Sequence, residues 1–432
     1  MLNFLVTIVV LGGILLFGLP VAFGLGSTSV ILAFFQDNIS LSFLTITVLE
    51  SVNSFTLLAV PLFIIMSQVL LVGKVGDNLF ETINAWVRHL PGGLAVATVF
   101  SCAIFAAITG SGAATAATIG MVAYPAMFSR GYDKPFTCGL LATGGVLGIL
   151  IPPSIPMIIY SSITDTSLDK LFMAGVVPGI LLTLLLAGYA VLRSLRGEYA
   201  PLPKASWGER WQLTRYNLPA FSLPVIIIGG IYTGMFTPTE AAAVGLVVSL
   251  VLTRFVYKTL SWHQLPQILL DSLTTTCMIG MIIIGAHLFG KVLALMNVPQ
   301  ELTQVVVDNN LSPLLFIVAV NVLLLVLGAL LETISCILLT TPLILPIMIA
   351  MEIDPIWYGV VLTVNMTIAL ITPPVGMDLY VIKGLRDDIR LEDVIKGVVP
   401  FIVILFLFLA LIVAVPGIST WLPSLMPTRG AF

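Results

Sequence analysis

The sequence predicts an all-α polytopic membrane protein made of two related halves. Of its 432 residues, 59% are hydrophobic and only 9% are charged, and the mean hydropathy is +1.12. Soluble domains carry about 25% charged residues, so this chain belongs largely in lipid. Two further observations carry the prediction: apolar sequence is interrupted by polar and helix-breaking residues over 109–156 and 328–378, and a repeat relates these stretches.

Both interruptions fall where lipid would forbid irregular backbone. A backbone group left unpaired in hydrocarbon costs several kcal/mol, so broken structure there must be buried in protein or line a polar cavity. Glycine, serine, threonine and proline interrupt the first stretch, which carries Ile-Pro-Pro-Ser near its end, and the second ends in Thr-Pro-Pro-Val-Gly-Met-Asp. We interpret the pair as a transport site.

The first half, residues 1–192, has seven expected elements in order. They are apolar runs over 2–19, 21–35 and 55–72, an amphipathic interface helix over 74–90, a re-entrant hairpin over 93–128, a helix over 136–163 broken at Pro152-Pro153, and a span over 171–192. Each hairpin leg is about one membrane thickness or shorter, which is typical of a re-entrant segment.

A polar linker over 193–216 separates the halves, and because no polar stretch is longer we expect no soluble domain. The second half, residues 217–432, repeats the order of the first. Its expected elements are apolar runs over 218–235, 241–256 and 269–294, a hairpin over 314–351, a helix over 356–381 broken at Pro373-Pro374, and a run over 398–415.

The halves align at a shift of 221 residues. Pro152-Pro153 falls on Pro373-Pro374, Pro125 on Pro346 and Asp133 on Asp354. At a shift of 222, Gly-Val-Val-Pro at 175–178 matches the same tetrapeptide at 397–400. Several matches at one shift indicate an internal repeat.

The repeat predicts inverted topology. About five crossings and one hairpin in each half invert the second copy, because five is odd. With the N-terminus outside and the linker inside, fifteen of the eighteen lysines and arginines face the cytoplasm, and only Lys170, Lys291 and Arg429 face out. That asymmetry follows the positive-inside rule, so we expect a periplasmic N-terminus.

Inverted repeats with broken helices are typical of secondary transporters, whose ions bind at freed backbone carbonyls near the midplane. We expect about two Na⁺ ions, held mostly by backbone oxygens, and no covalent cofactor. For any single residue, close helix packing by small side chains is an equally good reading. The expected first site comprises Ser111, Gly112, Gly145, Gly148 and Pro152, and the expected second site comprises Gly328, Thr333, Thr372, Gly376 and Met377.

Two carboxylates are expected within the membrane, Glu332 at the tip of the second hairpin and Asp378 just past the second break. A charged carboxylate at mid-bilayer costs about 2.5–3.5 kcal/mol on insertion scales, so each should face a polar interior. They could coordinate a cation or carry a proton, and Asp378 could instead reach the membrane interface from a helix end. The candidate solute-binding residues are Thr109, Ser111, Ser154, Glu332, Asn365 and Asp378.

Other polar residues favour structural roles. Glu240 is expected to cap the following helix with Thr237 or Thr239 as N-cap. His287 and Glu50 are lone polar residues in apolar spans, where a structural role is more common than ligation.

Four motifs in order, GSGAATAATIG, GILIPPSIPMIIY, FTPTEAAAVG and NMTIALITPPVGMDLYV, resemble the large membrane subunit of tripartite ATP-independent periplasmic (TRAP) transporters, in the ion transporter superfamily. The resemblance covers essentially the whole chain. It implies an elevator-type, Na⁺-coupled importer of a small organic acid, such as a C4-dicarboxylate or sialic acid, in the bacterial inner membrane. It also implies two partners, a small four-helix membrane subunit and a periplasmic solute-binding protein, and the chain would begin directly at its first repeat.

Three alternatives remain. A one-component Na⁺- or H⁺-coupled carboxylate carrier of the same superfamily would work without a binding protein. An intramembrane enzyme is disfavoured because the sequence has neither His-Glu-x-x-His nor Gly-x-Gly-Asp. A channel would conduct far faster than a carrier. No basic patch suggests a nucleic-acid partner.

Overall fold

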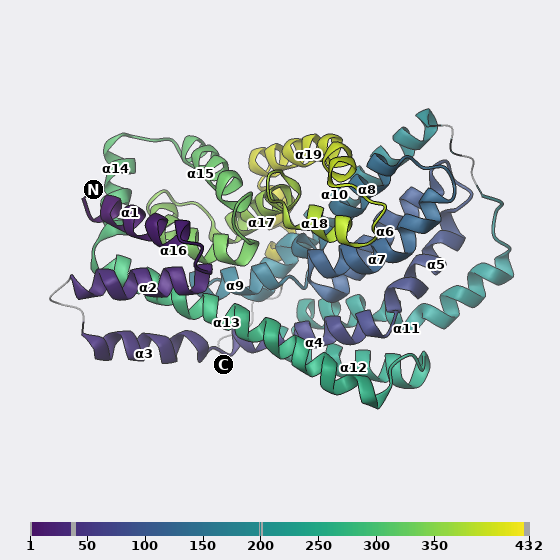
Figure 1. The fold of residues 1–432 in the computed structure, drawn as a ribbon, viewed down its shortest axis with the longest axis horizontal. Helices are drawn as coiled ribbons and strands as arrows, with labels where there is room; N and C mark the ends of the chain where they lie inside the picture. Colours follow the sequence, from purple (N-terminus) through teal and green to yellow (C-terminus); the bar gives the residue numbers. More distant parts are fainter. Residues whose placement is uncertain (1, 36–39, 198, 200–201, 427–432) are drawn as a thin grey trace.

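The computed structural model describes residues 2–35, 40–197, 199 and 202–426, and this part of the chain contains helices and connecting loops but no strand (Figure 1). The all-α prediction is therefore confirmed. Arg429, one of the three cations expected outside, lies beyond the described residues.

The described residues of the first half form ten α-helices. The hairpin region consists of two short helices, α6 and α7, and the broken helix of α8 and α9. The bounds are α1 Leu2–Leu16, α2 Val21–Phe34, α3 Leu41–Val52, α4 Ala59–Val72, α5 Val75–Val87, α6 Gly93–Thr109, α7 Gly112–Phe128, α8 Lys134–Leu150, α9 Ile155–Thr164 and α10 Leu168–Arg196.

The second half supplies the remaining α-helices, with α15 and α16 in the second hairpin region and α17 and α18 on either side of the second break. The bounds are α11 Trp207–Tyr232, α12 Pro238–Val251, α13 Leu265–Leu295, α14 Val298–Asp308, α15 Pro313–Gly328, α16 Thr333–Ala350, α17 Pro355–Ile371, α18 Met377–Gly384, α19 Leu391–Ala414 and α20 Gly417–Ser424. Residues 207–216 of the expected linker are helical, so only 197–206 separates α10 from α11.

By length and composition, six helical segments of the described chain could cross a membrane, and the bent pair α3–α4 makes a seventh. About five crossings in each half were expected. The count is lower because α1, α2 and α17 have only 15, 14 and 17 residues, and α11 begins with charged turns. The number of crossings and their inverted arrangement stay predictions.

Helices α8 and α17 form the centre of the molecule. Every residue from Phe136 to Leu150 and from Trp357 to Ile371 is buried, and the two helices contact each other. Helix α19 packs on both, while α6 and α7 cover α8 (Figure 1). Both breaks therefore follow helices that are almost completely buried.

A second group of helices lies along one long side of the molecule. Helix α13 contacts α2, α3 and α4, and α12 contacts α4 and α11 (Figure 1). Thr237 and Glu240 form a capping box at the start of α12, which confirms the capping role expected for Glu240. Helix α13 also contacts α16 of the second hairpin region, so it borders the central group.

Helices α5 and α14, one from each half, are short and amphipathic. Helix α5 corresponds to the expected interface helix and packs on α6 and α11. Helix α14 begins and ends close to the positions that a 221-residue shift from α5 gives, and it was not expected. The buried residues on its apolar side are Val298, Pro299 and Val306. The correspondence extends the repeat to one more element.

Candidate functional site

The tip between α6 and α7 lies against the break between α8 and α9. Gly110 ends α6 with φ +64°, a left-handed conformation that glycine adopts at little steric cost. Ser111 then caps α7, its Oγ accepting a hydrogen bond from Ala114 N at 3.4 Å. A Cβ on Gly110 would collide with the Pro153 carbonyl oxygen. The absence of a side chain at Gly110 is what lets the tip reach the break.

Two glycines of α8 line the same contact. A Cβ on Gly148 would lie 2.6 Å from the Ser111 carbonyl oxygen, and one on Gly145 would lie 3.1 Å from the Gly112 carbonyl oxygen. Four residues of the expected first cation site are therefore neighbours. The fifth, Pro152, is buried at the break, with its ring beside Gly175 of α10.

Asp378 joins this cluster from the second half. It stands in the first turn of α18, just after the second break, and only 1% of its surface is exposed. Its Oδ2 atom has no hydrogen-bond partner and lies 3.3 Å from the position that a Cβ on Gly112 would take. The interface role considered for Asp378 is therefore wrong, because the side chain is enclosed by α7 and α8 rather than exposed at an interface.

The residues expected in the second cation site are less closely gathered. Gly328 packs on α17, where its Cβ would lie 2.7 Å from the Ala369 Cβ. The Thr372 carbonyl oxygen would lie 2.9 Å from a Cβ on Gly376. Thr333 is buried in the first turn of α16, whereas Met377 is 42% exposed. The second break is thus more open than the first.

Most of the candidate solute-binding side chains are engaged within the protein. Thr109 Oγ1 donates to the Phe105 carbonyl at 3.0 Å, and Ser154 Oγ donates to the Ile149 carbonyl at 2.5 Å. Asn365 Nδ2 donates to the side chain of Asn321 at 2.7 Å and to its carbonyl at 3.0 Å. Glu332 is half-buried at the tip of the second hairpin region and accepts from Ser335 at 3.4 Å.

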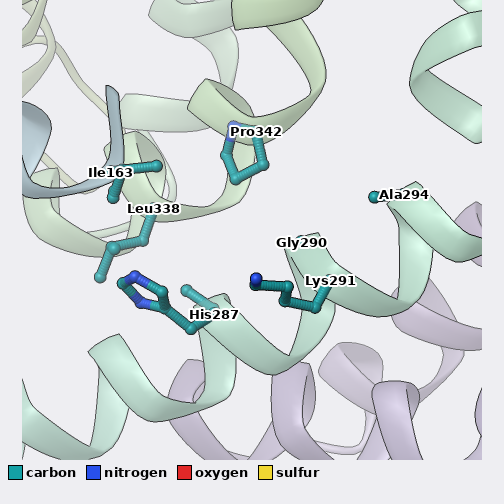
Figure 2. A pocket seen from close by; sticks show the side chains of 8 residues that line it. Ile163, His287, Gly290, Lys291, Ala294, Leu338 and Pro342 are labelled. Atoms are coloured by element: carbon teal, nitrogen blue, oxygen red, sulfur yellow. The ribbon is translucent and has the colours of Figure 1, made fainter. Parts of the chain in front are cut away.

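A pocket of about 160 Å³ lies between α13, the end of α9 and α16. Figure 2 shows the His287 ring and the Lys291 side chain extending from α13 into this space, opposite Leu338 and Pro342. His287 and Lys291 are four residues apart, so they share one face of the helix. An ammonium and an imidazole in an otherwise apolar pocket can hold an anionic group.

The sequence alone does not reveal this pocket. The charge pattern places Lys291 among the outward-facing cations, and the position of His287 in an apolar span favours a structural role, although their i, i+4 spacing puts them on one helix face. Among the described residues, no three His, Cys, Asp or Glu side chains gather as for a metal ion. Any cation at the first break would therefore depend mainly on backbone oxygens.

These features define a multi-pass helical membrane protein with broken helices at its centre, the architecture of a membrane transporter. The crystal structure of the YdaH transporter of Alcanivorax borkumensis has the same fold, with a TM-score of 0.65 over 94% of this chain and 98% of that one, at 13% identity.

The family follows from sequence. The family model for the tripartite ATP-independent periplasmic transporter, DctM component, matches residues 8–418. The chain is 40% identical to the C4-dicarboxylate TRAP transporter large permease protein DctM of Pseudomonas aeruginosa, covering 93% of both chains. It is 34% identical to the sialic acid TRAP transporter large permease protein SiaM of Vibrio cholerae, covering 96% of both. The chain belongs to this family of large TRAP permeases, and the resemblance seen in its motifs is confirmed.

Proposed function

We propose that this chain is the large subunit of a Na⁺-coupled secondary transporter that imports a small organic acid delivered by a periplasmic binding protein. The observation that carries the proposal is the cluster at the first break. There the carbonyl oxygens of residues 111 and 112 lie against Gly148 and Gly145, in a buried region of irregular backbone. Na⁺ is a hard cation that such oxygens suit, and a transporter binds its coupling ions at this kind of break.

The solute's carboxylate binds in the pocket beside His287 and Lys291. Support comes from its two nitrogen-bearing side chains and its position beside α16 of the second hairpin region. The acids carried by relatives, by their names, include C4-dicarboxylates and sialic acid, and both classes carry carboxylates. Our proposal for this chain is a small organic acid that carries a carboxylate.

Transport proceeds by an elevator movement. The moving part comprises the two hairpin regions and the two broken helices, α6–α9 and α15–α18. The fixed part comprises α13 with α2–α4, α11 and α12, together with α5. In support, the pocket's walls come from both groups, since His287 and Lys291 belong to α13, and Leu338 and Pro342 to α16. Movement of one group past the other would carry a bound solute across the membrane.

The driving force depends on the charge of the solute. Two Na⁺ ions with a monocarboxylate move one net positive charge, worth about 2.3 kcal/mol per 100 mV of membrane potential. The same two ions with a dicarboxylate are electroneutral, so a third cation would be needed to gain from the potential.

The partners are a small four-helix membrane subunit, which would enlarge the fixed part, and the periplasmic binding protein. This chain itself resides in the bacterial inner membrane with its N-terminus in the periplasm. In support, all the described salt bridges join residues assigned to the cytoplasmic side, so these segments share one face. They are Arg88–Glu209, Lys134–Asp388, Arg193–Asp133 and Arg386–Asp388.

Uptake in liposomes tests this function. The two membrane subunits are placed in liposomes and the binding protein is added outside. We expect labelled acid to accumulate under an inward Na⁺ gradient and not when K⁺ replaces Na⁺. Omitting the binding protein should abolish uptake. Equal uptake by this chain alone would establish the rival, a one-component carrier.

A further inference from the structure

We propose that Asp378, from the second half of the chain, is a direct ligand of the monovalent cation bound at the first break. This inference rests on the proposed Na⁺ coupling and adds to it a carboxylate that the backbone oxygens at the tip would otherwise lack. The bound ion would also link the two halves of the chain.

The carboxylate of Asp378 is buried without a partner among the described residues. Asp378 is 1% exposed, and its Oδ2 has neither a hydrogen bond nor, among the described residues, a salt bridge. An ionised carboxylate buried without a partner is strongly disfavoured, and buried charges in proteins are usually paired or bound to a metal ion. The position in the first turn of α18 gives some favourable interaction with the helix dipole, but it leaves Oδ2 unsatisfied.

Asp378 Oδ2 lies beside Gly112 at the tip between α6 and α7. A Cβ built on Gly112 would lie 3.3 Å from Asp378 Oδ2 and 3.4 Å from the Gly145 carbonyl oxygen. The two oxygens therefore border the same space beside Gly112, one negatively charged and one a backbone acceptor with a spare lone pair. Oxygen ligands of this mixture suit a hard cation.

Gly112 leaves the space beside Asp378 free of a side chain. At 3.3–3.4 Å from these oxygens, an added methyl group would be tight but would not collide with backbone. It would, however, occupy the space between the tip and Asp378. Glycine at this position therefore keeps open the volume that a cation needs, and Gly112→Ala is a graded way to close it.

The structural consequence is a link between the two breaks. Asp378 follows the α17–α18 break directly, while Gly112 and Gly145 belong to the tip and to α8. A cation between them would fasten α18 to α7 and α8, which it already contacts. Binding at the first break would thus depend on how the second break is arranged.

The test measures the Na⁺-induced rise in unfolding temperature of the full purified chain, with choline as the comparison cation. We expect Asp378→Asn to unfold at a higher temperature than wild type without Na⁺, because an unpaired buried charge is gone, and to show a smaller Na⁺-induced rise than wild type, because the ion at the first break is lost. Gly112→Ala should weaken apparent Na⁺ affinity at least about tenfold. Glu392→Gln, which changes an exposed carboxylate in the first turn of α19, should respond to Na⁺ like wild type.

A normal Na⁺-induced rise in Asp378→Asn would overturn the inference. The inference would also be overturned if the unfolding temperature of the wild-type protein changed with pH but not with Na⁺, because Asp378 would then bind a proton instead. If uptake nevertheless stayed Na⁺-dependent in both wild type and Asp378→Asn, the proposed function would stand without this ligand. If Asp378→Asn proved unstable, the Gly112→Ala affinity would decide by itself, since an unchanged value would also overturn the inference.

Discussion

Gly139 of α8 and Gly397 of α19 bring their two helices into direct backbone contact. A Cβ on Gly397 would lie 2.9 Å from Gly139 N, and one on Gly139 would collide with the Gly397 carbonyl. Small residues allow such close approach in membranes, where packing rather than water drives helix association. Because α8 leads to the first break, this contact also helps to position the residues of the proposed first cation site.

We therefore expect Gly139→Ala to force α19 away from α8 and to destabilise the protein by at least about 2 kcal/mol, in the range of overpacked cores. The measurement is thermal unfolding in detergent, read as a lower midpoint. Gly188→Ala on α10 is the matched control, because nothing lies within 4 Å of its Cβ position. Equal midpoints for the two variants would contradict the role of the close contact.

Asp388 connects three elements at the predicted cytoplasmic face. Its carboxylate accepts from Tyr124 at 3.1 Å and from Arg386 at 2.9 Å, and Lys134 Nζ lies 3.4 Å away. Partial desolvation raises the pKa of Asp388, but hydrogen bonds from Arg386, Tyr124 and Lys134 outweigh it and hold the pKa below its usual value. A lowered folded-state pKa contributes stability above the unfolded value of about 3.9, and that stability is lost as pH falls through the folded pKa.

Asp388→Asn should accordingly lower the unfolding midpoint at neutral pH, and the difference from wild type should shrink below about pH 4. Unfolding midpoints measured across this pH range check the sign. Asp387→Asn, at the exposed neighbouring position, serves as the control and should leave the midpoint unchanged. A difference that persists undiminished in acid would show that Asp388 acts without its charge.

Much of the fold could be predicted because its signals are local. The Pro-Pro pairs, the glycine clusters and the Thr237 cap are each specified by neighbours in sequence. The repeat did not predict one difference between the halves: α3 and α4 bend by 54°, whereas the corresponding α13 is continuous. Asn53 and Ser54 stand at the bend, and the corresponding Thr274 and Thr275 instead donate to carbonyls one turn earlier, at 2.9 and 3.1 Å. Asn and Ser compete with helical hydrogen bonds, while threonine can satisfy itself within the helix.

The site was only partly predictable for a different reason. Ser111, Gly112, Gly145 and Gly148 are close in space because the hairpin tip meets the break just after it in sequence. The approach of Asp378 to Gly112 depends on how the two halves pack, and no spacing in the sequence encodes that distance. The same holds for the pocket, whose walls come from α9, α13 and α16.

Asn321 and Asn365 form a buried hydrogen-bonded pair between α15 and α17. Interhelical polar pairs in membranes contribute about 0.6 kcal/mol on average and up to about 1.7 kcal/mol. We expect a double-mutant cycle with alanine at both positions to give a coupling energy in that range, measured by unfolding in detergent. Asn309→Ala, at an exposed position of the loop that precedes α15, should have no coupling to Asn365→Ala. Zero coupling between Asn321 and Asn365 would contradict the contact.

Lys291 offers the most direct test of the proposed solute pocket. Its side chain is exposed on α13 and extends into the pocket beside His287 (Figure 2). A hydrogen bond to a charged group contributes about 1.5–3 kcal/mol, so losing it should raise the KM for the acid at least about tenfold. Lys291→Gln should therefore weaken uptake at low solute concentration while its Na⁺-induced stabilisation stays at the wild-type value, because the first break lies on other elements. Lys170→Gln removes a second cation predicted on the same side of the membrane, outside the pocket, and should keep the wild-type KM. If Lys291→Gln and Lys170→Gln had the same KM as wild type, the solute's carboxylate would have to bind elsewhere.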